Sequence, residues 1–179
     1  MHASFITTED VVDWEDANRF VLGSPSRATA STVATVGIRL GTKAQWRVDV
    51  FPSVGHSCFQ DVRCVGDLIY IGYGQQVAVL SPATGSLTSY SLDGYFGCMC
   101  TALDPECADL GSSVLVASAS ELLCFDGTGR LIWRKSELGV DGVVIRQIRS
   151  GEIVGDAEWD PPGGWKPFRL RLDTGTSRS

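Results

Sequence analysis

The sequence lacks basic residues over a long central stretch. From residue 64 to residue 129 it has no Lys or Arg, whereas the rest of the chain is close to neutral. The net charge of −6 therefore arises in this stretch. Because neutralising phosphates requires a surplus of Lys and Arg, we do not expect a protein that coats nucleic acid. The stretch has seven acids: Asp67, Asp93, Asp104, Glu106, Asp109, Glu121 and Asp126.

The sequence also lacks the segments that direct a chain into or across a membrane. It has no run of about 18 apolar residues, so we expect no transmembrane helix. The N-terminal sequence MHASFITTEDVVDWED has no basic patch followed by an apolar run. We therefore expect no signal peptide and a cytoplasmic location.

The six cysteines do not follow the pattern of a secreted disulfide framework. Several lie in apolar runs, as in GCMC around Cys98 and Cys100 and LLCF around Cys124. A free cysteine packs like a small hydrophobe, and disulfide frameworks are typical of small secreted chains. We therefore expect reduced thiols within a core.

Residues 1–44 differ in composition from the rest of the chain. Residues 24–36 are rich in Ser, Thr and Ala, which is typical of a linker. Before them, the spacing of Val11, Trp14 and Val21 favours one short helix. We expect an N-terminal extension over these 44 residues, followed by a separate domain over residues 45–179.

The segments after residue 45 have the composition of β-strands. They are rich in β-branched and aromatic residues and are separated by Gly, Pro, Asp and Ser. No helical pattern lies between them, which favours antiparallel sheets over parallel βαβ units. Representative segments are DLIYIGYG (67–74), QVAVLSP (76–82), SVLVASAS (113–120) and ELLCFD (121–126).

An internal repeat supports this interpretation. The blocks LIYIGYGQQVAVLSPATGSL and VLVASASELLCFDGTGRLIW both place two strands, a Thr-Gly turn and a return strand in the same order. Thr84-Gly85 recurs as Thr128-Gly129 and again as Thr174-Gly175. A period of about 40 to 50 residues is that of four-stranded propeller blades. The glycines supply the positive φ that tight hairpins need.

VAVLSPATGSL and LLCFDGTGRLIW resemble the repeats of quinoprotein-like and WD40-like β-propellers, over residues 64–175. The resemblance implies an all-β fold of antiparallel, blade-like sheets in a small or incomplete propeller. Closed propellers have about 4–8 blades, whereas three turn copies are visible here. Either a further blade has diverged within residues 33–66, or the ring is open, or a partner completes the sheet. The resemblance matches no cofactor-binding residues, and we expect no cofactor.

Two groups of residues suggest catalysis. His56 and Cys58 lie two apart, so on an extended strand they share a face and could form a Cys-His pair. Asp156, Glu158 and Asp160 alternate in the same way, and general acid–base hydrolysis uses paired carboxylates. A hydrolase is therefore one alternative. The non-catalytic alternatives are a structural role for His56 and a simple turn over residues 161–164.

Metal binding is not favoured by the spacing of possible ligands. Zinc sites typically contain Cys-x2-Cys, whereas Cys98 and Cys100 are separated by one residue. Asp104, Glu106 and Asp109 lack the order of an EF-hand calcium loop. We expect no metal site.

The acidic stretch carries the leading hypothesis for function. Such a field attracts basic partners, although acids also serve solubility alone. We expect a non-catalytic module that binds a basic protein, with a bacterial immunity protein that blocks a toxin as one example. A sheet module that oligomerises is a further alternative, and the oligomeric state stays open. The candidate contact residues are Asp104, Glu106, Asp109, Glu121, Asp126, Trp159 and Trp165.

Overall fold

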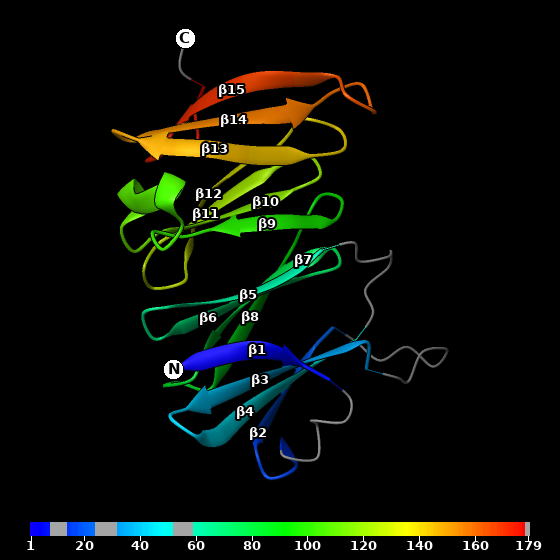
Figure 1. Ribbon diagram of the computed structural model, residues 1–179, viewed down its shortest axis with the longest axis vertical. Helices are drawn as coiled ribbons and strands as arrows, with labels where there is room; N and C mark the ends of the chain where they lie inside the picture. Colours follow the sequence, from blue (N-terminus) through cyan, green and yellow to red (C-terminus); the bar gives the residue numbers. More distant parts are fainter. Residues whose placement is uncertain (8–13, 24–31, 52–58, 178–179) are drawn as a thin grey trace.

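The described residues form four small β-sheets stacked in chain order along the longest axis (Figure 1). A computed structural model describes residues 1–7, 14–23, 32–51 and 59–177. Fifteen strands and one short 3₁₀ helix, η2 (Pro105–Leu110), are present in these residues. The all-β fold of small, mainly antiparallel sheets confirms the fold class expected from the sequence.

The first sheet is assembled out of chain order. Its spatial order is β1-β3-β4-β2, and the outer strand β2 runs parallel to β4 while the other pairs are antiparallel. Its strands are β1 (His2–Ile6), β2 (Asn18–Leu22), β3 (Ala34–Leu40) and β4 (Lys43–Val50).

The next two sheets are meanders in which neighbouring strands follow one another along the chain. Gly85 (φ 65°) and Gly129 (φ 82°) occupy the predicted turn positions with positive φ. The second sheet contains β5 (Gln60–Val65), β6 (Leu68–Tyr73), β7 (Gln76–Ser81) and β8 (Ser86–Ser91). The third contains β9 (Phe96–Cys100), β10 (Val114–Ser118), β11 (Leu122–Phe125) and β12 (Leu131–Lys135).

The fourth sheet is a three-stranded meander that ends in the third predicted turn. It contains β13 (Val143–Arg149), β14 (Glu152–Glu158) and β15 (Trp165–Arg171). After β15, Gly175 (φ 66°) turns the chain, and an antiparallel bridge joins Leu170 to Ser177.

The N-terminal segment differs from the expected extension. Residues 18–22 form β2, so the helix predicted around Trp14 and Val21 is absent there, and Val11 lies outside the described residues. Residues 34–36 belong to β3 rather than to a linker. The boundary expected after residue 44 falls inside β4. Pairing with β4, which supplies a buried sheet face, outweighs the local preferences of these residues.

Apolar side chains fill the three spaces between consecutive sheets. Alternate residues of one strand point in opposite directions. Accordingly, Ile69 and Ile71 pack toward the first sheet, whereas Tyr70 packs toward the third. In the same way, Val116 packs toward the second sheet and Leu115 toward the fourth. Strands β6, β7, β10 and β11 of the middle sheets are nearly continuous apolar runs because both of their faces are buried.

Consecutive sheets also meet through their first strands. Strand β1 contacts β5, β5 contacts β9, and β9 contacts β13. These four strands therefore follow one another along the stack. Each sheet also has two ends, at which turns connect its strands. η2 and the turn after β11 lie at one end, while the turns before β9 and β11 lie at the other.

Candidate functional site

Burial explains part of the absence of Lys and Arg from the central stretch. Residues 64–129 form most of the second and third sheets, in which strands β6, β7, β10 and β11 are covered on both faces, whereas β8 and several turns are exposed. Burying a basic side chain in the covered strands would cost several kcal/mol unless it were paired, so an apolar sequence is required there. In the described residues, most basic side chains lie instead on the first sheet, on the edge strand β12 and on the fourth sheet.

The acids around η2 stabilise local structure. The Asp104 carboxylate accepts hydrogen bonds from the Thr101 backbone N–H (2.8 Å) and from the Arg63 guanidinium (3.3 Å). Asp109 accepts one from the Ser150 backbone N–H (2.8 Å), which links η2 to the fourth sheet. These two carboxylates already have partners within the protein, and Glu106 lines a neighbouring cavity.

The remaining two acids of the predicted binding face lie at opposite ends of the third sheet. Asp126, after β11, accepts hydrogen bonds from the Thr128 hydroxyl (2.6 Å) and backbone N–H (2.9 Å). The Thr128 hydroxyl, together with further bonds from Arg130, lowers the pKa of Asp126 to about 2. Glu121 lies before β11 and is buried, where it accepts a bond from the Asp93 N–H (2.8 Å). The predicted acidic residues are thus divided between two surfaces.

The three alternating carboxylates do not converge in one cavity of the described residues. Asp156 pairs with Arg146 (2.8 Å), and Glu158 accepts a hydrogen bond from the Gly163 N–H (2.6 Å). Asp160 lies in the turn, where its backbone carbonyl accepts a bond from Gly164. Glu158 lines the cavity described below, and the other two carboxylates are not among its lining residues. His56 and Cys58 lie outside the described residues.

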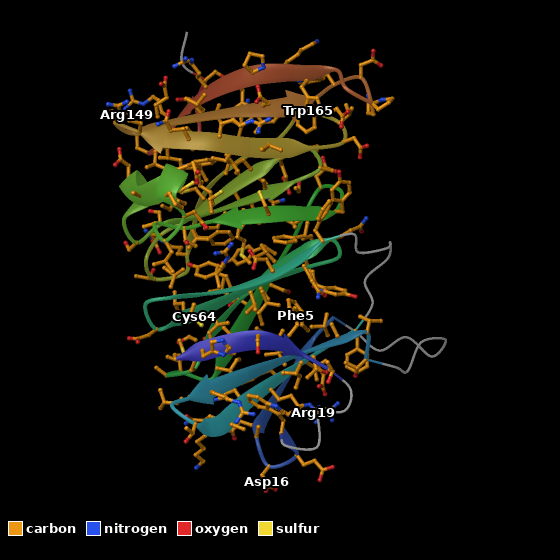
Figure 2. All side chains as sticks on the ribbon, viewed as in Figure 1. Phe5, Asp16, Arg19, Cys64, Arg149 and Trp165 are labelled. Carbon is orange, nitrogen blue, oxygen red and sulfur yellow. The ribbon has the colours of Figure 1, made fainter. Side chains whose placement is uncertain are left out.

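An aromatic pocket lies at the end of the sheets where the chain enters β9. Its volume is about 410 Å³, and its walls come from three sheets. Phe59 precedes β5, Tyr95 precedes β9, and Trp165 begins β15. Trp165 is labelled beside the fourth sheet in Figure 2. We call this cavity, lined by Phe59, Tyr95, Asp141, Glu158 and Trp165, the aromatic pocket.

Specific contacts hold the rings of the aromatic pocket. The Phe59 and Tyr95 rings lie 5.9 Å apart, between their centroids, at an angle of 35°. The Tyr95 hydroxyl donates a hydrogen bond to the Asp141 backbone carbonyl. A Cβ at Gly142 would lie 2.9 Å from the Trp165 ring, so only glycine allows the ring to pack this closely there. Phe59 (52% exposed) and Trp165 (42%) still present apolar surface to solvent.

Carboxylates accompany these aromatic rings. Asp141 and Glu158 line the pocket, and Asp160 lies in the neighbouring turn. Among the described residues, neither Asp141 nor Asp160 is engaged in a salt bridge. The Lys166 ammonium lies 5.6 Å from the centroid of the Trp159 ring, which is a cation–π distance. Aromatic faces beside carboxylates suit a cationic side chain and do not require a reactive group.

The sequence pointed to only part of this pocket. Glu158 and Trp165 were identified from one turn, and Trp159 lies next to them. Phe59, Tyr95 and Asp141 were missed because each lies in a different connection. No spacing rule joins residues that only the packing of three sheets brings together.

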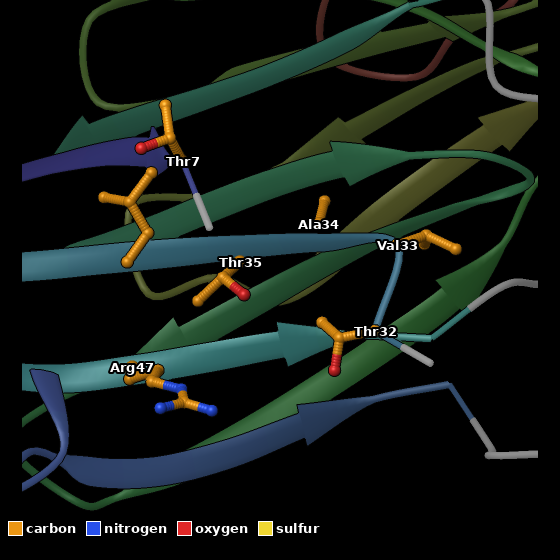
Figure 3. Close-up of a pocket in the computed structure, with 7 residues that line it drawn as sticks. Thr7, Thr32, Val33, Ala34, Thr35 and Arg47 are labelled. Carbon is orange, nitrogen blue, oxygen red and sulfur yellow. The ribbon is translucent and has the colours of Figure 1, made fainter. Parts of the chain in front are cut away.

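A second cavity, of about 370 Å³, lies on the first sheet (Figure 3). Thr35 of β3 and Arg47 of β4 line it, together with Thr32 before β3. The Arg47 guanidinium is bound to Asp49 by two hydrogen bonds (2.6 and 3.0 Å) and is already paired. This cavity therefore contains a structural ion pair and carries no assignment of function.

Two further properties concern the described residues as a set. No group of three or more His, Cys, Asp or Glu side chains among them has a metal-binding arrangement. The helices among them include none with the length and apolar character needed to cross a membrane.

Comparisons of the chain with known proteins give likenesses of fold but no match to a family model or a curated protein. Its fold is similar to the crystal structure, at 1.35 Å resolution, of a protein of unknown function from Bacteroides caccae, with a TM-score of 0.46 and 12% sequence identity. The match covers 80% of this chain and 58% of that one, so the chain spans just over half the length of that protein.

Proposed function

We propose that this protein is a non-catalytic binding module whose aromatic pocket takes a basic side chain from a partner protein. The observation that carries the proposal is the grouping of Phe59, Tyr95 and Trp165 with Asp141 and Glu158 around one cavity. A cation placed over an aromatic face gains about 0.5–2 kcal/mol, and a nearby carboxylate adds attraction.

The arrangement of the sheets supports a propeller-like interpretation of the fold. In a propeller, each blade places its first strand toward a shared axis. Here β1, β5, β9 and β13 contact one another in that order, as first strands around an axis would. The stack is thus best described as an open, propeller-like arc. The aromatic pocket lies at the end of the sheets where the chain enters β9.

Charge supports a basic partner rather than a neutral one. Asp93 and Glu121 lie next to the aromatic pocket, because Ser118, which lines it, donates a hydrogen bond to the Asp93 carbonyl (2.8 Å). Asp93, Asp141 and Asp160 contribute negative charge that favours a cation here, and Lys166 and the Arg134 that faces Glu121 offset part of it. A basic toxin neutralised by this chain is one partner of this kind.

The test uses short peptides because they isolate recognition of one side chain. Acetyl-Gly-Arg-Gly-amide and acetyl-Gly-Lys-Gly-amide are titrated into the protein, with the norleucine peptide as the uncharged control, and the tryptophan indole resonances are followed by NMR. The basic peptides should bind more tightly than the norleucine peptide. Trp165→Ala should weaken their binding about tenfold, which corresponds to about 1.4 kcal/mol.

Ile132→Ala is the matched control, because Ile132 is similarly exposed (47%) but lies on β12 away from the aromatic pocket. It should leave the affinity unchanged. Equal binding of the norleucine peptide, or full affinity in Trp165→Ala, would contradict the proposal.

A further inference from the structure

Three thiols meet between the third and fourth sheets, and the proposed function assigns no role to them, although Cys98 also lines the aromatic pocket. Cys98 and Cys100 alternate on β9 and therefore share a face, and Cys107 lies on η2. The Cys100 thiol is hydrogen-bonded to both of the others. Cys100 is thus the central member of the thiol cluster formed by Cys98, Cys100 and Cys107.

The thiol cluster is reachable by small solutes. All three cysteines line a cavity of about 350 Å³, together with Glu106 and Arg146. Cys98 and Cys100 are half-buried, whereas Cys107 is almost fully covered (3% exposed). A molecule the size of a hydroperoxide can therefore approach the two thiols on β9.

The environments of the cysteines predict that they react at different rates. The hydrogen bond from Cys100, aided by the charge of Arg63, lowers the pKa of Cys98 despite its burial. By contrast, burial raises the pKa of Cys64 and raises that of Cys124 to about 12. Because the thiolate is the form that reacts with oxidants, Cys98 is the preferred target among the described cysteines.

We propose that the thiol cluster is an oxidation site at which a hydroperoxide reacts with Cys98 and Cys100 then closes a disulfide with it. In the first step the Cys98 thiolate attacks the peroxide, forming an S–O bond and breaking the O–O bond. With one proton taken up, the products are Cys98 sulfenic acid and an alcohol, or water from hydrogen peroxide. In the second step the Cys100 sulfur displaces the hydroxyl of Cys98, forming the S–S bond and releasing water. The hydroperoxide is reduced by two electrons, and the two thiols supply them.

The order of the two steps follows from access as well as from the coupling of the thiols, because Cys98 lines both this cavity and the aromatic pocket, whereas Cys100 lines only the first of these two. The hydrogen bond to Cys98 and the negative charge of its thiolate raise the pKa of Cys100, which keeps Cys100 protonated at first. Conversion of Cys98 to the sulfenic acid removes that charge, so Cys100 can deprotonate more easily and attack. Cys98 is therefore oxidised first and Cys100 acts second.

The position of the pair on one strand predicts a strained, easily reversed disulfide. Alternate residues of a strand have Cα atoms about 6.6–6.8 Å apart, near the upper limit for a disulfide, and their parallel Cβ atoms lie farther apart than the roughly 3.5–4.5 Å that a disulfide allows. Closing the bond therefore requires β9 to bend locally, next to the existing register shift between Ala117 and Ser118 of β10. Strained disulfides are more easily reduced than relaxed ones. We expect the Cys98–Cys100 disulfide to be reduced rapidly by dithiothreitol.

The experiment treats the full chain with hydrogen peroxide and maps the products by mass spectrometry. A Cys58→Ser background removes the one cysteine that lies outside the described residues. Dimedone, which traps sulfenic acids, should label Cys98 at least about tenfold faster than Cys64 or Cys124. Without dimedone, a peptide that contains an internal disulfide between residues 98 and 100 should appear, and dithiothreitol should restore both thiols.

Two variants separate the roles within the thiol cluster. Cys100→Ser should stop the reaction at the Cys98 sulfenic acid, whereas Cys107→Ser should still form the disulfide. The proposal is overturned if Cys64 and Cys124 of the parent protein oxidise as fast as Cys98. It is also overturned if the disulfide includes Cys107, or if Cys107→Ser abolishes it. The measurement on the parent protein alone decides the first point, whatever the stability of the variants.

Discussion

The first and third sheets each bury one carboxylate, and they hold it in different ways. Asp49 on β4 is fully buried, and two arginines pair with it. Glu121, before β11, is 1% exposed, and backbone and side-chain donors surround it. The comparison shows how a buried charge can serve either long-range strand pairing or a local turn.

In the first sheet, the buried carboxylate joins strands that no hairpin connects. Arg19 on β2 donates to Asp49 (2.5 Å), and Arg47 on β4 donates to the same carboxylate (2.6 and 3.0 Å). Strand β2 is parallel to β4, so a tight turn cannot fix their register. The ion pair between the strands contributes to that register directly.

In the third sheet, the carboxylate organises two connections at one end. Glu121 accepts a hydrogen bond from the Asp93 N–H (2.8 Å), and the Arg134 guanidinium lies 3.6 Å away. The Glu121 N–H in turn donates to the Ser118 hydroxyl (3.1 Å). Here the hairpins already set the strand register, and the carboxylate only fixes the loops.

The largest effect is expected from Asp49→Asn. The substitution keeps the side-chain volume but removes the charge that both arginines require. We expect the free energy of unfolding to fall by about 2–3 kcal/mol, since hydrogen bonds to charged groups are the strong ones. Urea unfolding followed by tryptophan fluorescence measures it. Asp67→Asn, at an exposed turn, is the control and should change little.

Acid should remove the same contribution from the parent protein. Burial alone would raise the pKa of Asp49, but hydrogen bonds from Arg47 and Arg19 outweigh it and hold the pKa below the ordinary value of 3.8. Stability from this group is therefore fully present above about pH 4 and is lost as pH falls through the lower folded pKa. The difference in unfolding free energy between parent and Asp49→Asn should shrink below pH 4. A constant difference from pH 7 to pH 2 would contradict this account.

Glu121→Gln should have a smaller effect. The glutamine oxygen can still accept the Asp93 N–H, so only the charge facing Arg134 is lost. We expect a loss of about 1 kcal/mol by urea unfolding. A loss equal to that of Asp49→Asn would remove the distinction between the two sheets.

The smallest effect is expected from Arg130→Ala at the exposed turn after β11. Arg130 pairs with Asp126 (3.2 Å), but its side chain is 81% exposed. Exposed pairs of this kind contribute about 0–0.5 kcal/mol, and the Thr128 bonds to Asp126 remain. The midpoint of urea unfolding should stay within error of the parent. A large destabilisation would show that this turn, and not Glu121, organises the third sheet.

The middle sheets could be predicted from sequence, whereas the first sheet could not. Two meanders carry their own signal, because strand, turn and return strand are adjacent and Gly85 and Gly129 mark the turns. In the first sheet, Val21 pairs with Asp49 across a long connection, and nothing local in the sequence encodes that pairing.

The acidic stretch is visible in the composition, and the stacking of the sheets accounts for part of it. Burial on both sides excludes Lys and Arg from β6, β7, β10 and β11, whereas the exposed strand β8 lacks them without such a reason. A single sequence does not show which faces another sheet will cover. The residues of the aromatic pocket were hidden for the same reason, since three separate sheets contribute them.

The confinement of each strand ladder to one sheet has a mechanical consequence. Each strand ladder is confined to one sheet, and side-chain packing forms the layers between the sheets. Apolar layers have no direction of their own, whereas ladders pulled lengthwise must break many hydrogen bonds together. Under tension along the stack, the molecule would therefore come apart between sheets before any sheet unravels, and would lengthen in discrete steps.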